Sequence, residues 1–115
     1  LFSDGVGSGR ISLDRFVEVT STNPAKLFGL YPRKGVVAVG SDADLVLWDP
    51  DETRTIRDED MFSGSGYSVH AGRVVTGWPV LTMRRGEIVY RDGEIRGTAG
   101  SGQLVPRSRW QDPGF

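Results

Sequence analysis

The stretch Gly35–Asp49, GVVAVGSDADLVLWD, decides the fold of this chain because it joins a glycine turn, an acidic turn and an apolar strand. The valines within residues 36–39 predict a first short strand. Gly40 and the acidic run after it predict a tight turn, and residues 44–48 predict a second strand. Since that second run is apolar on both faces, we expect a central strand that is covered on both sides.

A first short helix is predicted upstream of this stretch, after a glycine-rich connection over residues 1–10. Ser12 is placed to accept a hydrogen bond from a backbone N–H group of the first turn. One face of this helix is mostly apolar and must pack against something, and we expect its cover to lie outside the chain. The residues of this face are Leu13, Phe16, Val17 and Thr20.

A second short helix is predicted to restart at Asn23. Asn23 is the expected N-cap, and Pro24 suits the first helical position, where a missing N–H group costs nothing. Gly29 is the expected stop.

The chain beyond the second strand is predicted to be rich in short strands and turns. We expect a turn at residues 49–51, an exposed strand at 54–57 and an irregular loop at 61–72. From Val74 onward, apolar runs predict a three-stranded meander, in which Asp-Gly is a strong hairpin signal. The turns that separate these runs are Gly77-Trp78-Pro79, Arg85-Gly86 and Asp92-Gly93.

Bulk composition limits the classes of function. A chain of 115 residues with 16 glycines suits one modest β-rich domain. A net charge of -1 removes the electrostatic argument for a nucleic-acid or membrane partner. The absence of cysteine excludes disulfides and thiolate metal sites and is compatible with a cytoplasmic location. No apolar run is long enough for a membrane helix. Because the chain begins at Leu1 without a methionine, we expect a fragment of a longer protein.

Candidate chemistry is sparse. The one histidine, His70, stands in a Gly/Ser/Tyr loop without a second imidazole, so an internal zinc site is nearly excluded. Asp42 and Asp44 suit turn chemistry, with a hard-cation site or an acid–base pair as the alternatives. Residues 58–60 are interpreted as a solvated acidic run, and the glycines of residues 5–9 lack the context of a phosphate loop. We therefore assign no catalytic, substrate-binding or metal-binding residue to this chain.

Five pieces of the sequence form an ordered set. They are Gly9-Arg10-Ile11-Ser12 with Phe16-Val17, Asn23-Pro24-Ala25-Lys26, Tyr31-Pro32-Arg33-Lys34-Gly35, Gly40-Ser41-Asp42-Ala43-Asp44-Leu45-Val46 and Gly77-Trp78-Pro79-Val80. Together they resemble the dihydropyrimidinase and hydantoinase branch of the cyclic amidohydrolases. One departure is His70-Ala71-Gly72, because members of the branch usually carry an aromatic residue and a glutamate before this glycine.

The resemblance implies a mainly β fold with N-terminal helices, taken from the C-terminal part of such an enzyme. Residues 1–34 would be the terminal helices of a (β/α)8 TIM barrel, residues 35–97 part of a composite β-sandwich, and residues 98–115 a C-terminal tail. The parent would hydrolyse the ring amide of dihydropyrimidines or hydantoins. It would use a binuclear zinc centre with a carboxylated lysine, whose ligands all lie upstream of Leu1. A non-catalytic dihydropyrimidinase-related scaffold or interaction protein of the same fold is the alternative.

The expected partners of this segment are the remainder of its own polypeptide and, by resemblance, the other subunits of a homotetramer. The tail after Gly97 cannot form a core of its own, yet it contains Leu104, Trp110 and Phe115. We expect it to contribute to oligomer contact, with simple disorder as the alternative.

Overall fold

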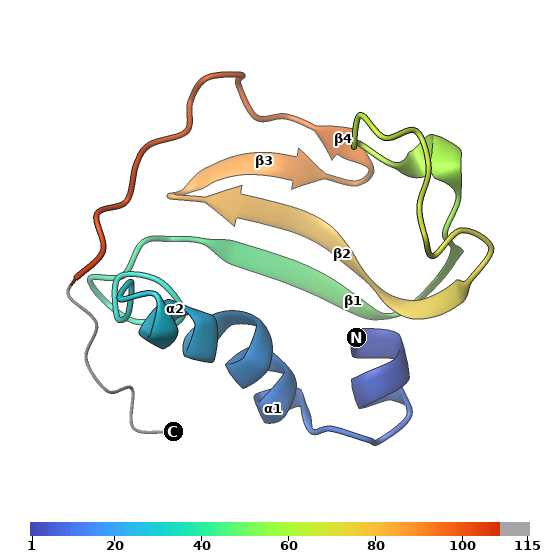
Figure 1. Ribbon diagram of the computed structural model, residues 1–115, viewed down its shortest axis with the longest axis horizontal. Helices are drawn as coiled ribbons and strands as arrows, with labels where there is room; N and C mark the ends of the chain where they lie inside the picture. The colour runs from blue at the N-terminus through green and yellow to red at the C-terminus, as the bar shows by residue number, and fades with distance from the viewer. Residues whose placement is uncertain (109–115) are drawn as a thin grey trace.

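A curved antiparallel sheet of four strands lies above a helical layer from the N-terminal quarter of the chain (Figure 1). The computed structural model describes residues 1–108 of the 115. Sheet order follows chain order, so each strand pairs with the next. The strands are β1 (Leu45–Thr55), β2 (Val74–Arg84), β3 (Glu87–Arg91) and β4 (Glu94–Ile95).

The helical layer follows one nearly continuous helical path after an initial π-helical turn. This turn, η1 (Phe2–Gly7), replaces the irregular connection predicted for residues 1–10, so that prediction is wrong for most of the segment. The path then comprises α1 (Leu13–Val17), the π-helical turn η2 (Glu18–Thr22) and α2 (Asn23–Leu27). None of the described helices is long and apolar enough to cross a membrane.

Two of the three helix-boundary predictions are confirmed. Ser12 Oγ accepts the Arg15 N–H group at 3.1 Å, as expected for an N-cap. Gly29 ends α2 with a φ of +68°, and the N–H group of Leu30 reaches back to Ala25 O at 2.8 Å. The prediction that Asn23 restarts the helix as a cap is wrong, because its backbone is itself helical. Its N–H group donates to Glu18 O, and this wider turn carries the helix into Pro24 without a break.

The predicted first strand at residues 36–39 does not form. This segment is an irregular loop, and the Val37 side chain is 84% exposed. A strand needs a neighbour for its backbone groups, and no described strand pairs with this segment.

The predicted second strand forms but differs in length and position. β1 continues through the expected turn at residues 49–51, where the ladder with β2 is interrupted between Asp49 and Thr53. Asp49 Oδ1 accepts the N–H groups of Asp51 and Glu52 at 2.9 and 3.1 Å, so the turn chemistry is present inside a bulged strand. β1 is an edge of the described sheet rather than its centre, and the exposed side chains of Val46 and Leu47 lack the cover that their pattern predicts.

The predicted meander is confirmed as β2, β3 and β4. Both connecting turns have two consecutive residues with positive φ, 47° and 82° at Arg85-Gly86 and 51° and 90° at Asp92-Gly93. This is the backbone that a two-residue hairpin of type I′ requires. Gly77-Trp78-Pro79, by contrast, does not separate two strands but lies within β2.

A small aromatic cluster joins the helical layer to the sheet. The Phe16 ring of α1 lies 5.5 Å from the Phe2 ring and 5.9 Å from the Trp48 ring of β1, centroid to centroid. The expectation that the helix stripe finds no cover in this chain is thus wrong for Phe16. It holds for Leu13 and Val17, which are 58% and 47% exposed.

Candidate functional site

The chemistry-bearing residues of the second half of the chain are not brought together. His70 lies exposed in the loop before β2, where its N–H group donates to Ser68 Oγ at 3.2 Å. The acidic run forms the exposed turn η3 (Asp58–Asp60), and Asp58 Oδ1 accepts the Ser68 N–H group at 2.7 Å. Within residues 1–108, no three His, Cys, Asp or Glu side chains are grouped to hold a metal ion.

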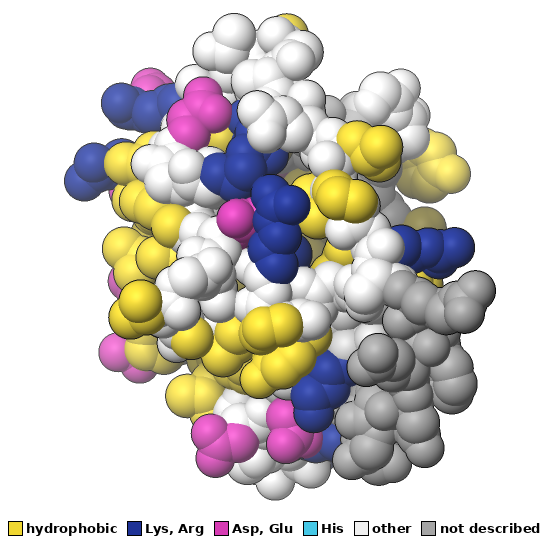
Figure 2. Space-filling view, turned by 90° about the vertical axis from the view of Figure 1, so that its left-hand side faces the viewer, with side chains coloured by type: hydrophobic (Ala, Val, Ile, Leu, Met, Phe, Trp, Pro, Cys, Tyr) yellow, Lys and Arg dark blue, Asp and Glu magenta, His cyan; other side chains and the backbone are white. Residues whose placement is uncertain are grey.

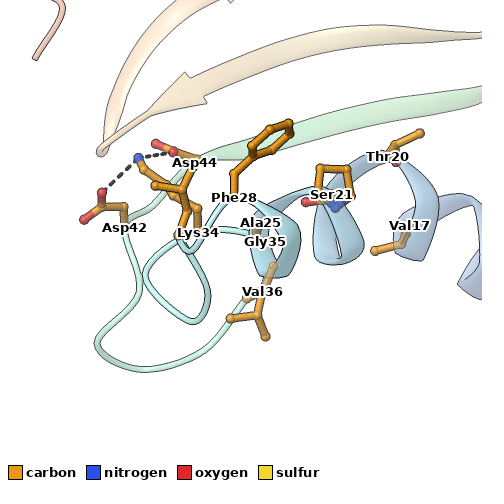
Figure 3. A pocket seen from close by; sticks show the side chains of 13 residues that line it. Val17, Thr20, Ser21, Ala25, Phe28, Lys34, Gly35, Val36, Asp42 and Asp44 are labelled. Atoms are coloured by element: carbon orange, nitrogen blue, oxygen red, sulfur yellow. Dashed lines mark hydrogen bonds and ion pairs between the residues drawn. The ribbon is translucent and has the colours of Figure 1, made fainter. Parts of the chain in front are cut away.

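Asp42 and Asp44, in contrast, converge on one ammonium group. The Lys34 Nζ atom lies 2.8 Å from Asp42 Oδ2 and also donates to Asp44 Oδ2, as the dashed lines of Figure 3 show. Arg33 Nε donates to Asp42 Oδ2 at 3.0 Å. The loop between α2 and β1 therefore closes on itself through this cluster, which we call the acidic corner (Arg33, Lys34, Asp42 and Asp44).

The acidic corner also binds the turn between β2 and β3. Asp44 Oδ1 accepts the Arg85 N–H group at 2.8 Å, and the neighbouring Ala43 O accepts the Gly86 N–H group at 3.0 Å. Asp44 thus caps backbone as predicted, although the N–H group belongs to a hairpin 41 residues away rather than to its own turn. Sequence reasoning missed both Lys34 and Arg85. Lys34 lies ten residues before Asp44, but no spacing pattern signals that this loop folds back on itself, and Arg85 comes from a hairpin 41 residues away.

The contacts of the acidic corner stabilise the charged forms of Lys34, Asp42 and Asp44. Burial disfavours the charge on Lys34, but hydrogen bonds and attraction from Asp42 and Asp44 outweigh it and raise the pKa of Lys34. The Lys34 hydrogen bond, helped by Arg33, lowers the pKa of Asp42. Burial alone would raise the pKa of Asp44, but the hydrogen bonds from Lys34 and from the Arg85 N–H group lower it.

These shifts decide what the acidic corner can do chemically. A general acid or base works best with a pKa near neutrality, whereas here each pKa moves away from neutrality. An ammonium group already occupies the space between the two carboxylates, where a hard cation would have to bind. The geometry therefore favours a structural tie over the acid–base and cation alternatives.

A pocket of about 340 Å³ lies beside the acidic corner. Its walls come from the helical layer and from the loop after α2, with the ion pairs at one end (Figure 3). Figure 2 shows the same end of the molecule, where hydrophobic side chains gather beside lysine and arginine. An apolar pocket of this kind suits packing against another part of a protein better than catalysis. The apolar residues that line the pocket include Val17, Pro24, Ala25, Phe28, Leu30, Val36 and Val37.

The acidic corner predicts a specific loss of stability in acid. Both carboxyl pKa values are lower in the folded protein than the value of about 3.9 in an unfolded chain. Their contribution is therefore present above about pH 4 and is lost as the pH falls through the folded pKa values. We expect an Asp42→Asn/Asp44→Asn variant to be less stable than the wild type at pH 7, with the difference shrinking towards pH 3.

Urea unfolding at several pH values between 3 and 7 measures this difference. As a control, Asp51→Asn/Asp60→Asn removes two exposed carboxylates and should give a smaller difference that varies less with pH. A constant gap between the wild type and the Asp42/Asp44 variant from pH 7 to pH 3 would contradict the assignment.

The chain is similar in sequence to a known protein family and to several of its members. A family model described as the amidohydrolase family matches residues 2–89. The chain is 48% identical to dihydropyrimidinase of Rattus norvegicus over 107 residues, which cover 93% of this chain and 21% of the relative. It is 49% identical to D-hydantoinase of Geobacillus stearothermophilus over 110 residues, which cover 96% of this chain and 23% of the relative.

Solved structures agree with these relatives. The crystal structure of dihydropyrimidinase from Brevibacillus agri NCHU1002 matches 96% of this chain and 24% of its own, with a TM-score of 0.93 and 47% identity. The chain thus spans less than a quarter of the length of each relative. On the family match and these identities, the chain belongs to the amidohydrolase family, with strong similarity to its dihydropyrimidinases and D-hydantoinases.

Proposed function

We propose that this chain is the C-terminal segment of a cyclic amidohydrolase that hydrolyses the ring amide of dihydropyrimidines or hydantoins. The observation that carries the proposal is the 49% identity to a D-hydantoinase across 96% of the chain. Similarity at this level extends over the helical layer, the sheet and most of the tail, so it is not confined to one short motif.

The segment would join two parts of the enzyme. In this proposal residues 1–34 are the terminal helices of the barrel, residues 35–97 part of the β-sandwich, and residues 98–115 the tail. Two features support the division: the helical path ends at Gly29, and the acidic corner begins the return into the sheet. The exposed side chains of Leu13 and Val17 on the helices supply an apolar face for the barrel wall.

The residues of this segment do not fit a zinc centre. His70 is exposed and lies in a loop without a second imidazole, and the acidic corner is neutralised by Lys34 and Arg33. Lys34 does not fit the role of a carboxylated lysine, because that modification needs a neutral amine and its pKa is raised. We propose that the ligands of a binuclear zinc centre lie elsewhere in the polypeptide and that no residue of this chain has a catalytic, substrate-binding or metal role.

The proposal includes a cytoplasmic enzyme that assembles as a homotetramer. Exposed apolar side chains on β1 and on the loop before it support cover by the rest of the polypeptide and by other subunits. These side chains are Val37, Val39, Val46 and Leu47.

An assay of the complete polypeptide tests the function. We expect the complete protein, loaded with zinc, to open the rings of dihydrouracil and hydantoin, and residues 1–115 alone to open neither and to retain no zinc after dialysis. Ring opening can be followed by the loss of ultraviolet absorbance. A complete, folded, zinc-loaded protein without this activity would favour the non-catalytic scaffold of the same fold, and a tightly held zinc ion on residues 1–115 would contradict the assignment of ligands.

A further inference from the structure

The tail runs back from the sheet to the helical layer along one end of the molecule (Figure 1). It leaves β4 with the N–H groups of Arg96 and Gly97 both donating to Val89 O, at 2.9 and 3.2 Å. Residues 98–108 then follow an irregular path, which we call the strap. Because a segment without secondary structure depends on its side contacts for its position, those contacts indicate what the strap does.

The first anchor of the strap is Ser101, which lies at the turn between β2 and β3. Arg84 Nη2 donates to Ser101 Oγ at 2.5 Å, and Arg85 Nη2 donates to Ser101 O at 3.0 Å. The Ser101 hydroxyl in turn donates to Thr98 O at 2.6 Å. Two guanidinium groups from one hairpin turn thus hold a single residue of the strap.

The second anchor is Ser108, at the end of α2. Its N–H group and its hydroxyl both donate to Gly29 O, at 2.9 and 3.1 Å. A β-carbon on Gly29 would lie only 2.6 Å from Ser108 O and 3.1 Å from Ser108 Oγ. Gly29 is therefore required twice: for the positive φ that ends the helix and for the close approach of the strap.

Arg85 connects this strap to the acidic corner. Its backbone N–H group donates to Asp44, and its guanidinium group donates to Ser101. The hairpin turn is consequently held from one side by the loop that follows α2 and from the other by the strap that returns to α2. The end of the helical layer and the end of the sheet are therefore linked twice, once through the loop after α2 and once through the strap.

We propose that the strap is an inter-domain clasp that holds the terminal barrel helices against the sandwich part. This inference rests on the proposed division of the enzyme into those two parts. The two anchors fix the strap to both of the parts that it connects, the hairpin turn of the sheet and the end of α2.

Truncation of the complete protein after Gly97 tests the clasp. We expect amide hydrogen exchange to become about tenfold faster or more at two separate places, the end of α2 (residues 25–30) and the hairpin turn (residues 84–87). Faster exchange at only one of the two places, or at neither, would overturn the proposed coupling between the end of α2 and the hairpin turn.

Two substitution pairs keep the test independent of a gross folding failure. Gly29→Ala should accelerate exchange at residues 25–30 more than Gly66→Ala does around its own site, since Gly66 has a similar φ of +72° and no atom within 4 Å of its β-position. Arg84→Met should loosen the strap, whereas Glu87→Gln changes only the other partner of the Arg84 guanidinium group and leaves its contact with Ser101 in place. Equal effects within each pair would overturn the clasp.

These readouts are separate from ring opening. An inactive protein with the expected exchange pattern would refute the proposed function and leave the clasp standing. An active enzyme without that pattern would refute the clasp alone.

Discussion

Replacement of Gly77 by alanine is expected to destabilise the complete protein by about 3 kcal/mol or more. Gly77 has a φ of +94°, which an alanine adopts only with strain of about 1–3 kcal/mol. A β-carbon there would also overlap the Phe2 ring and lie 2.8 Å from Trp48 Nε1. Forcing the cluster apart should cost about 1–3 kcal/mol more. Urea unfolding monitored by circular dichroism measures the loss.

Gly40→Ala is the matched control for this substitution. Gly40 has nearly the same φ, +92°, but no atom lies within 4 Å of its β-position. It should therefore show the backbone strain without the overlap, and the difference between the two variants isolates the crowding around Gly77. Equal losses for both would show that Phe2 and Trp48 do not pack against this glycine.

The Phe16 side chain is half-buried within this segment, and in the proposed complete protein the rest of the polypeptide would complete its burial. Its replacement by alanine in that protein is expected to cost on the order of 3–5 kcal/mol, the range for a buried aromatic side chain. Phe16 is the member of the aromatic cluster that comes from the helical layer, and its ring meets both Phe2 and Trp48 edge to face. Its removal leaves a cavity where the helices meet the sheet. We expect the free energy of unfolding to fall and the unfolding rate to rise.

Phe62→Ala supplies the comparison for Phe16. Phe62 also makes one edge-to-face contact, with Tyr90 at 6.2 Å between centroids, but its side chain is 68% exposed. We expect a clearly smaller loss there. A loss below about 1 kcal/mol for Phe16→Ala would show that the cluster does not contribute to stability.

The parts of the fold that could be predicted from the sequence are those set by one residue and its near neighbours. The Ser12 cap, the Gly29 stop and the two hairpin turns belong to this class. Each depends on the φ preference of a residue or on a hydrogen bond that spans a few positions. The resemblance to cyclic amidohydrolases rested on such short pieces, and the family match confirms it.

Predictions failed where a segment depends on what lies beside it in space. Residues 36–39 have strand propensity but no described neighbour to pair with, and β1 has a central-strand pattern but lies at the edge of the sheet. The bulge at residues 49–53 and the proline within β2 resemble strand ends in the sequence, because a bulge is recognised only from its partner strand. The predicted anchor residues Trp110 and Phe115 lie outside the part of the chain that the structure describes.

For the candidate site, the sequence by itself determined that the chain holds one histidine, no cysteine and two aspartates at a tight corner. Only the tertiary structure decided what those aspartates do, because Lys34 reaches them through the folding of their own loop and Arg85 through the docking of a distant hairpin. The same holds for the Phe2, Phe16 and Trp48 cluster and for the strap. Contacts of this kind arise from the packing of whole elements, and local propensity carries no information about them.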